Sequence, residues 1–208
     1  MKVESSTIQN KFLRVKTLNY GASLFEVYHK KKKINLILNL GSKKNYQNKH
    51  PSLGSTCGRY AGRISNSKFK IGNRKFILNA NEGKNILHGG KIGFYILPWK
   101  KLNQKKDKIV YQLFSVNNDQ GFPGNLVVIC TYQLRNKFLI IKYEYKSDKS
   151  THVNLTNHSY WNLEKDKKKM IYNHELKLNS AKYLQINKNL IPTGRFKNIK
   201  SLSWTAKL

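Results

Sequence analysis

The sequence predicts an all-β protein, an antiparallel β-sandwich or barrel built as one domain over residues 1–208. Short runs of alternating apolar and polar residues recur along the chain, Gly, Asn and Pro separate them, and no stretch keeps the 3.6-residue period of an amphipathic helix. With 39% hydrophobic and 12% aromatic residues in 208, the chain can bury a core and is unlike a disordered protein. No internal repeat or linker divides it.

The predicted strands follow one another from residue 22 to residue 157. They cover residues 22–28, 34–40, 67–71, 74–78, 108–116, 125–134, 137–146 and 151–157. Gly72-Asn73 predicts a tight hairpin between two of them, because Gly and Asn tolerate the positive φ of primed turns. A second hairpin is predicted with Arg135-Asn136 at its turn.

The charge is strongly basic, with 40 Lys and Arg against 10 Asp and Glu and a net charge of +30. Such a balance raises the possibility of nucleic-acid binding. However, the basic residues are nearly all Lys spread along the chain, whereas phosphate and base recognition favours the planar Arg fork. A compositional bias towards Lys and Asn codons explains the charge better, so neither a nucleic-acid nor a membrane partner is expected.

The two cysteines, Cys57 and Cys130, form neither a disulfide framework nor a metal-ligand pair at useful spacing. They are interpreted as small buried thiols in a reducing compartment. The N-terminal residues lack an apolar signal core, and no window reaches the length of a membrane span. A cytoplasmic protein is therefore expected.

Two short segments depart from the background of strands and turns. "CGRYAGRI" (57–64) places Arg59 and Arg63 four residues apart between glycines, where an arginine can donate to sugar or carboxylate oxygens; a turn with surface arginines fits equally well. "NILHGG" (85–90) delivers His88 to a Gly-Gly bend, where the imidazole can project into a cleft. Taken alone, such a histidine is more often structural.

A third segment, "LTNHSYWNL" (155–163), is the richest in chemistry. By strand alternation, His158, Tyr160 and Asn162 share one face. Imidazole and amide groups bind hydroxyls, and an aromatic ring packs against the C–H face of a sugar. A proton-transfer site for a sugar and a buried core histidine are both compatible with these residues. The turn "NDQGFPG" (118–124), with Phe122 as its anchor, is interpreted as structural.

Taken together and in order, these segments resemble the aldose 1-epimerase (galactose mutarotase) family. The matching stretches are "LNYGASL" (18–24), "GRYAGRI" (58–64), "NILHGG" (85–90) with "GF" (93–94), "DQGFPGNL" (119–126), "NLTNHSYWNL" (154–163) and "LIPTGRF" (190–196). The resemblance implies a galactose mutarotase-like antiparallel β-sandwich with a sugar cleft, no metal and no cofactor. It also implies interconversion of the α and β anomers of a hexose such as glucose or galactose.

The resemblance also assigns roles. His158 matches the family's proton donor to the ring oxygen, and His88 matches the second cleft histidine, which binds the sugar and polarises oxygen near the reacting centre. Arg63 matches the sugar-binding arginine, and Tyr160 and Asn162 are expected to contact substrate. In the family a carboxylate removes the C1 hydroxyl proton, the ring opens, the C1–C2 bond rotates, and the aldehyde recloses on the other face.

The family's general-base glutamate and a sugar-binding aspartate belong to a C-terminal part. In this sequence no Asp or Glu follows Glu175, so the chain matches the family without that part, and its general base is unknown. A sandwich incomplete at the C-terminus is expected. A catalytically impaired or vestigial carbohydrate-binding homologue is therefore the alternative to an active isomerase. The motifs resemble the branch that acts on unphosphorylated sugars more than the hexose 6-phosphate branch.

Overall fold

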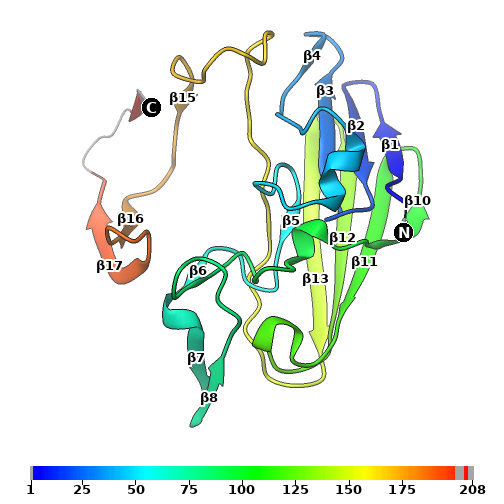
Figure 1. Ribbon diagram of the computed structural model, residues 1–208. Helices are drawn as coiled ribbons and strands as arrows, with labels where there is room; N and C mark the ends of the chain where they lie inside the picture. Colours follow the sequence, from blue (N-terminus) through cyan, green and yellow to red (C-terminus); the bar gives the residue numbers. More distant parts are fainter. Residues whose placement is uncertain (1, 200–203, 206–208) are drawn as a thin grey trace. The chain divides into compact units, whose positions relative to one another are not determined.

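The computed structural model describes residues 2–199 and 204–205, and their contacts divide the chain after Trp161 into two units (Figure 1). Within the described residues, regular structure consists of β-strands and short 3₁₀ helices. The predicted all-β class is therefore confirmed. In the same part of the chain, no helix has the length and hydropathy needed to cross a membrane.

The first unit contains two antiparallel four-stranded sheets, each with its strands in sequence order. The first sheet consists of β1 (Ser5–Gln9), β2 (Leu13–Leu18), β3 (Leu24–His29) and β4 (Ile34–Asn35). The second consists of β10 (Lys100–Gln104), β11 (Lys108–Ser115), β12 (Leu126–Arg135) and β13 (Phe138–Ser147). Each is a meander of hairpins, the arrangement that short antiparallel connections produce.

The main core combines side chains from both sheets, which shows that they pack as a sandwich. Alternate residues of β11 and β12 are buried, as a strand with one face on a core requires. Their apolar side chains join those of β2 and β3 in one cluster that includes Val15, Leu24 and Val128. A buried hydrogen bond of 2.5 Å from Tyr132 Oη to the Ala22 carbonyl also joins β12 to the turn between β2 and β3.

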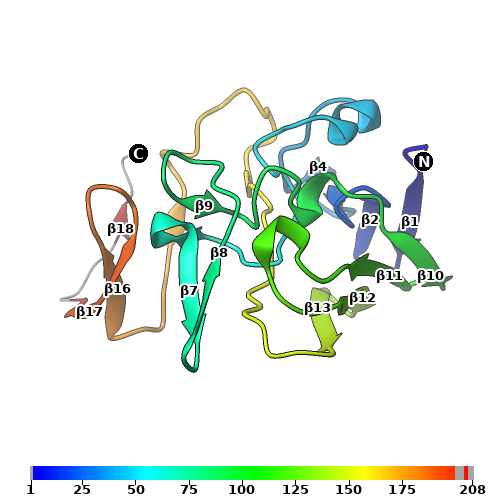
Figure 2. The same cartoon turned by 60° about the horizontal axis from the view of Figure 1, so that its bottom comes forward.

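Several two-stranded pairs and 3₁₀ helices complete the first unit. The pairs are β5 (Thr56–Cys57) with β14 (Thr156–Asn157), β6 (Arg63–Ile64) with β9 (Ile86–Leu87), and β7 (Lys68–Ile71) with β8 (Arg74–Ile77). The 3₁₀ helices are η1 (Lys43–Gln47), η2 (Ser65–Ser67), η3 (Phe94–Ile96) and η4 (Asp119–Gly121). Figure 2 shows the β7–β8 hairpin extending away from the two sheets.

The second unit, from Asn162 onwards, is formed by short strands with mostly exposed side chains. β16 (Lys182–Ile186) and β17 (Pro192–Asn198) form a hairpin, and β15 (Glu175–Leu176) pairs with β18 (Trp204–Thr205). The motif "LIPTGRF" lies at the turn and the start of β17.

Most predicted strands are confirmed, with three corrections. The predicted strand 151–157 is regular only at Thr156–Asn157, because the segment crosses several short partners instead of one long strand. The predicted strand 34–40 shortens to Ile34–Asn35. The second hairpin turns at Asn136 and Lys137, since Arg135 pairs with Phe138 and Asn136 has the positive φ. Strands β1, β2 and β10 of the two sheets were not predicted, nor were β16 and β17 of the second unit.

Arg59 is one of the largest fully buried side chains, although arginine is rarely buried without partners. It is 1% exposed, and its guanidinium donates to the carbonyls of Pro123, Gly124, Ser115 and Val116 and to Ser115 Oγ at 2.6–3.2 Å. Burial lowers its pKa. Arg59 therefore joins the "GRYAGRI" segment to the loops at the ends of β11 and β12, and of the two arginines it has the structural role.

We expect Arg59→Ala to lower the free energy of unfolding by ~3 kcal/mol or more, because it leaves several buried carbonyls unsatisfied. Urea denaturation followed by circular dichroism measures this. Lys142→Ala is the matched control, since it removes an exposed ion pair to Glu144 and should cost less than ~1 kcal/mol. Equal losses in the two variants would contradict the assignment.

Candidate functional site

A polar and aromatic cleft of about 330 Å³ lies in the first unit. Residues 49–52, the turn 81–82 with Leu87 and His88, Tyr95, and the segment 158–160 provide its lining. Two residues predicted from sequence to be catalytic, His88 and His158, therefore lie in the same cleft. Imidazoles, a carboxylate and tyrosine rings together form the mixed surface expected of a small-molecule site.

His88 is held in one orientation by the β6–β9 pair. Its backbone N–H donates to the Gly62 carbonyl at 3.0 Å, and the Gly62 N–H donates to its Nδ1 at 3.1 Å. Because Nδ1 accepts, the proton of the neutral ring resides on Nε2. A Cβ on the following residue, Gly89, would lie 1.9 Å from the Gly58 carbonyl oxygen, so only glycine fits the bend after His88.

The electrostatic surroundings keep His88 neutral. Burial is the main cause, followed by the neighbouring His158 and Arg63, and together they lower the pKa of His88 to about 4, although Glu82 opposes the shift. A neutral ring with its proton on Nε2 is a hydrogen-bond donor at neutral pH. His88 is therefore suited to binding an oxygen atom and unsuited to acting as a cationic acid.

His158 lies beside β5 in an extended segment. Its N–H donates to the Ser55 carbonyl and its carbonyl accepts from Gly54 N–H, both at 2.9 Å. The His158 ring is 5.1 Å from the His88 ring, at 86° to it, and 5.1 Å from the Tyr160 ring. Among the described residues, the buried Nδ1 of His158 has no hydrogen-bond partner. Within the part of the chain that the structure describes, no group therefore fixes its tautomer through Nδ1.

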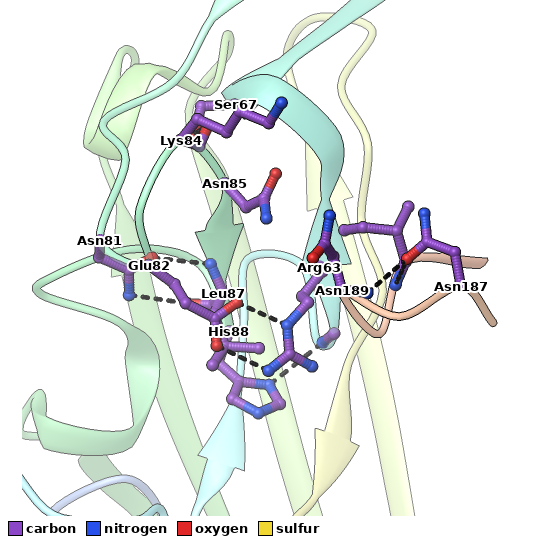
Figure 3. Close-up of polar contacts among 12 residues, drawn as sticks. Arg63, Ser67, Asn81, Glu82, Lys84, Asn85, Leu87, His88, Asn187 and Asn189 are labelled. Atoms are coloured by element: carbon purple, nitrogen blue, oxygen red, sulfur yellow. Dashed lines mark hydrogen bonds and ion pairs between the residues drawn. The ribbon is translucent and has the colours of Figure 1, made fainter. Parts of the chain in front are cut away.

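Arg63 is paired with Glu82, a residue that sequence reasoning did not single out. Arg63 Nε and Nη2 donate to the two carboxylate oxygens at 2.5 and 2.6 Å, a bidentate geometry (Figure 3). Glu82 lines the cleft, whereas Arg63 is not part of its lining. The hydrogen bonds from Arg63 lower the pKa of Glu82, so the carboxylate is ionised at neutral pH.

Tyr160 and Asn162 have different surroundings. Tyr160 lines the cleft, and its hydroxyl donates to the Pro51 carbonyl at 3.3 Å. Asn162 belongs to the second unit and is 2% exposed; its amide donates to the Lys169 carbonyl and accepts from Glu164 N–H. The structure thus brings Tyr160 together with His158, while the contact of Asn162 with a sugar stays a prediction.

His50 and Tyr95 also line the cleft and were missed in the sequence. His50 lies between Tyr46 and Tyr95, with ring centroids 5.1 and 5.2 Å away, and burial lowers its pKa. The dipeptide His50-Pro51 was the available signal, but nothing local connects it to residues 88 and 158. Within residues 2–199 and 204–205, no three His, Cys, Asp or Glu side chains gather as ligands for a metal ion. The expectation that no metal or cofactor is needed stays a prediction.

Comparison with known proteins agrees with the motifs. The family model for aldose 1-epimerase matches residues 4–207. The chain belongs to the aldose 1-epimerase family. It is 32% identical to the galactose mutarotase of Sus scrofa over 205 residues, which cover 97% of this chain and 60% of the relative. It is 35% identical to the aldose 1-epimerase of Haemophilus influenzae over 209 residues, again 97% and 60%.

Solved structures of family members confirm the galactose mutarotase-like sandwich. The GalM/aldose epimerase homologue from C. elegans superposes with a TM-score of 0.89 at 26% identity, covering 96% of this chain and 62% of the other. The galactose 1-epimerase from Lactobacillus acidophilus gives 0.86 at 31% identity, covering 97% and 60%. This family member thus spans about 60% of the length of the curated relatives it matches.

The neutral state of His88 can be measured. We expect an NMR titration of His88 to have a midpoint near pH 4. An unfolded histidine titrates near ~6.5. Between these two values the unfolded chain binds a proton that native His88 does not, so His88 makes stability fall as the pH drops through this window. His88→Asn should lack that part of the pH dependence; a midpoint near 6.5 in the native protein would contradict the assignment.

Proposed function

We propose that the chain binds a hexose in this cleft and interconverts its α and β anomers, with His158 as the proton donor to the ring oxygen. The observation that carries the proposal is the perpendicular pair of His88 and His158, 5.1 Å apart within one cleft of a family member. The relatives' names, galactose mutarotase and aldose 1-epimerase, support galactose, or an aldose more generally, as substrate, and glucose is proposed as an aldose of the same kind.

The two histidines divide the chemistry. His158, whose Nδ1 has no hydrogen-bond partner among the described residues, donates a proton to the ring oxygen as the C1–O5 bond breaks and recovers it on reclosure. Neutral His88 donates its Nε2 hydrogen to a sugar oxygen near C1. The open aldehyde rotates about C1–C2 and closes on the other face. In this scheme the C1 hydroxyl proton passes to solvent water as the ring opens and returns to the C1 oxygen on reclosure.

Aromatic and polar side chains complete the proposed binding surface. Tyr160 packs against the C–H face of the sugar, since its ring stands 5.1 Å from that of His158 and lines the cleft. Arg63 contributes to the binding surface indirectly, because its ion pair holds the carboxylate of Glu82 in place. A contact of Asn162 with the sugar is proposed from the motif "NHSYWNL" alone, since its amide is bonded to Lys169 and Glu164.

The second candidate function is carbohydrate binding without catalysis. Among the described residues that line the cleft, Glu82 is the one that bears a carboxylate, and Arg63 holds its pKa low, which makes it a weak proton acceptor. A sugar-binding cleft that lacks an efficient general base is the site expected of a catalytically impaired homologue.

We also propose a cytoplasmic location. Cys57 and Cys130 are buried free thiols, which persist in reducing compartments. Burial raises the pKa of Cys57 to about 11 and that of Cys130 to about 12, so both thiols are protonated and unreactive.

Polarimetry of freshly dissolved α-D-glucose and α-D-galactose tests the activity. We expect the chain to accelerate the decay of optical rotation, and His158→Ala to reduce the rate ~10²–10⁴-fold because it removes the acid. His29→Ala, at the half-buried end of β3 and outside the cleft lining, is the matched histidine control and should retain full activity. Sugar-dependent NMR shifts at His88 without any acceleration would sink the isomerase proposal and favour binding alone.

A further inference from the structure

The side chain that the Arg63–Glu82 pair presents to the cleft is the carboxylate. Glu82 is part of the lining and its side chain is 37% exposed, whereas Arg63 lies outside the lining and is 21% exposed. Arg63 donates one hydrogen bond to each carboxylate oxygen. A carboxylate has about four acceptor sites, so roughly two remain available on Glu82.

The turn that carries Glu82 is fixed without help from its side chain. Asn81 accepts from Leu87 N–H at 2.7 Å and donates to the Leu87 carbonyl at 3.0 Å (Figure 3). Glu82 and Asn85 also pair through their backbones. Ser67 Oγ donates to the Lys84 carbonyl at 3.0 Å. The backbone therefore holds the position of Glu82, and Arg63 holds the orientation of its carboxylate.

We infer that Glu82 is a specificity-determining residue that accepts a hydrogen bond from one hydroxyl of the bound hexose, with Arg63 as the positioning residue behind it. The inference rests on the proposed sugar cleft. It names the residue by which the cleft distinguishes a hexose that carries this hydroxyl from one that lacks it. A fixed acceptor discriminates between sugars, because a sugar that lacks the hydroxyl leaves one acceptor site of the carboxylate without its partner in the complex.

The charge state agrees with this role. The hydrogen bonds from Arg63 lower the pKa of Glu82, so the group is an ionised acceptor at neutral pH and a poor base. Its negative charge also opposes the lowering of the His88 pKa, which shows that the two residues share one electrostatic environment.

A scan of deoxy-hexoses tests the inference. Dissociation constants of glucose and of its 2-, 3-, 4- and 6-deoxy analogues are measured from NMR shifts of His88 in the native chain, in Glu82→Ala and in Glu82→Gln. In the native chain one analogue should bind ~10-fold more weakly than glucose. In Glu82→Ala that difference should shrink to within ~2-fold. Glu82→Gln, which keeps the shape, should give an intermediate value and serves if the alanine variant is unstable.

A double-mutant cycle of Arg63→Ala and Glu82→Ala, with glucose affinity as the measured quantity, tests the positioning role of Arg63. If Arg63 acts through Glu82, Arg63→Ala weakens glucose binding in the native chain but has no further effect in the Glu82→Ala background. The matched control is Glu26→Gln, which removes the carboxylate of the Arg14–Glu26 pair between β2 and β3 and should leave every ratio unchanged. Additive losses from Arg63 and Glu82 would overturn its positioning role.

Polarimetry on the same samples separates this inference from the proposed function. If binding selectivity among the deoxy-hexoses depends on Glu82 but no mutarotation is detected, the inference holds and the isomerase proposal is wrong. If the native chain catalyses mutarotation but the ratios of the deoxy-hexose dissociation constants are the same in the native chain and in Glu82→Ala, the inference alone is overturned. It is also overturned if Glu82→Ala lowers the mutarotation rate as much as His158→Ala does while its hexose dissociation constants stay unchanged. Absence of hexose binding in the native chain overturns both.

Discussion

Both cleft histidines depend on the pairing of one segment, residues 54–64. Its first half runs beside the chain at His158 through β5 and β14, and its second half pairs through β6 with β9, which ends next to His88. Between the two halves, buried Arg59 ties the segment to the loops after β11 and before β12. The sandwich therefore positions the site through this segment, and a change that displaces it moves both histidines.

The same backbone treats the two imidazoles differently. The N–H of Gly62 donates to Nδ1 of His88 and so fixes the tautomer of that ring. Nδ1 of His158 has no partner among the described residues. This difference supports the proposed division of roles, with His88 as the binding residue and His158 as the proton donor.

Local patterns were sufficient for part of this architecture. Strands β11 to β13 have long apolar alternation, and their predictions are confirmed; His88 and His158 were found because their motifs are distinctive. Strands β1 and β10 were missed because polar residues dominate them and their pairing is set by neighbours. Glu82 was missed for a related reason: only the register of β6 against β9 places it beside Arg63. Long-range register is not encoded in any single stretch.

The Arg63–Glu82 pair also affects whether the cleft would bind a neutral or a phosphorylated sugar. In a chain with a net charge of +30, an isolated arginine at the cleft would attract anionic solutes such as sugar phosphates. Glu82 neutralises Arg63 locally and faces the cleft itself, where an ionised carboxylate repels a phosphate and accepts from a hydroxyl. Lys49 remains as a cation in the lining, but its flexible ammonium is a solvated point charge. The fixed electrostatics of the wall therefore support the proposed unphosphorylated hexose over a sugar phosphate.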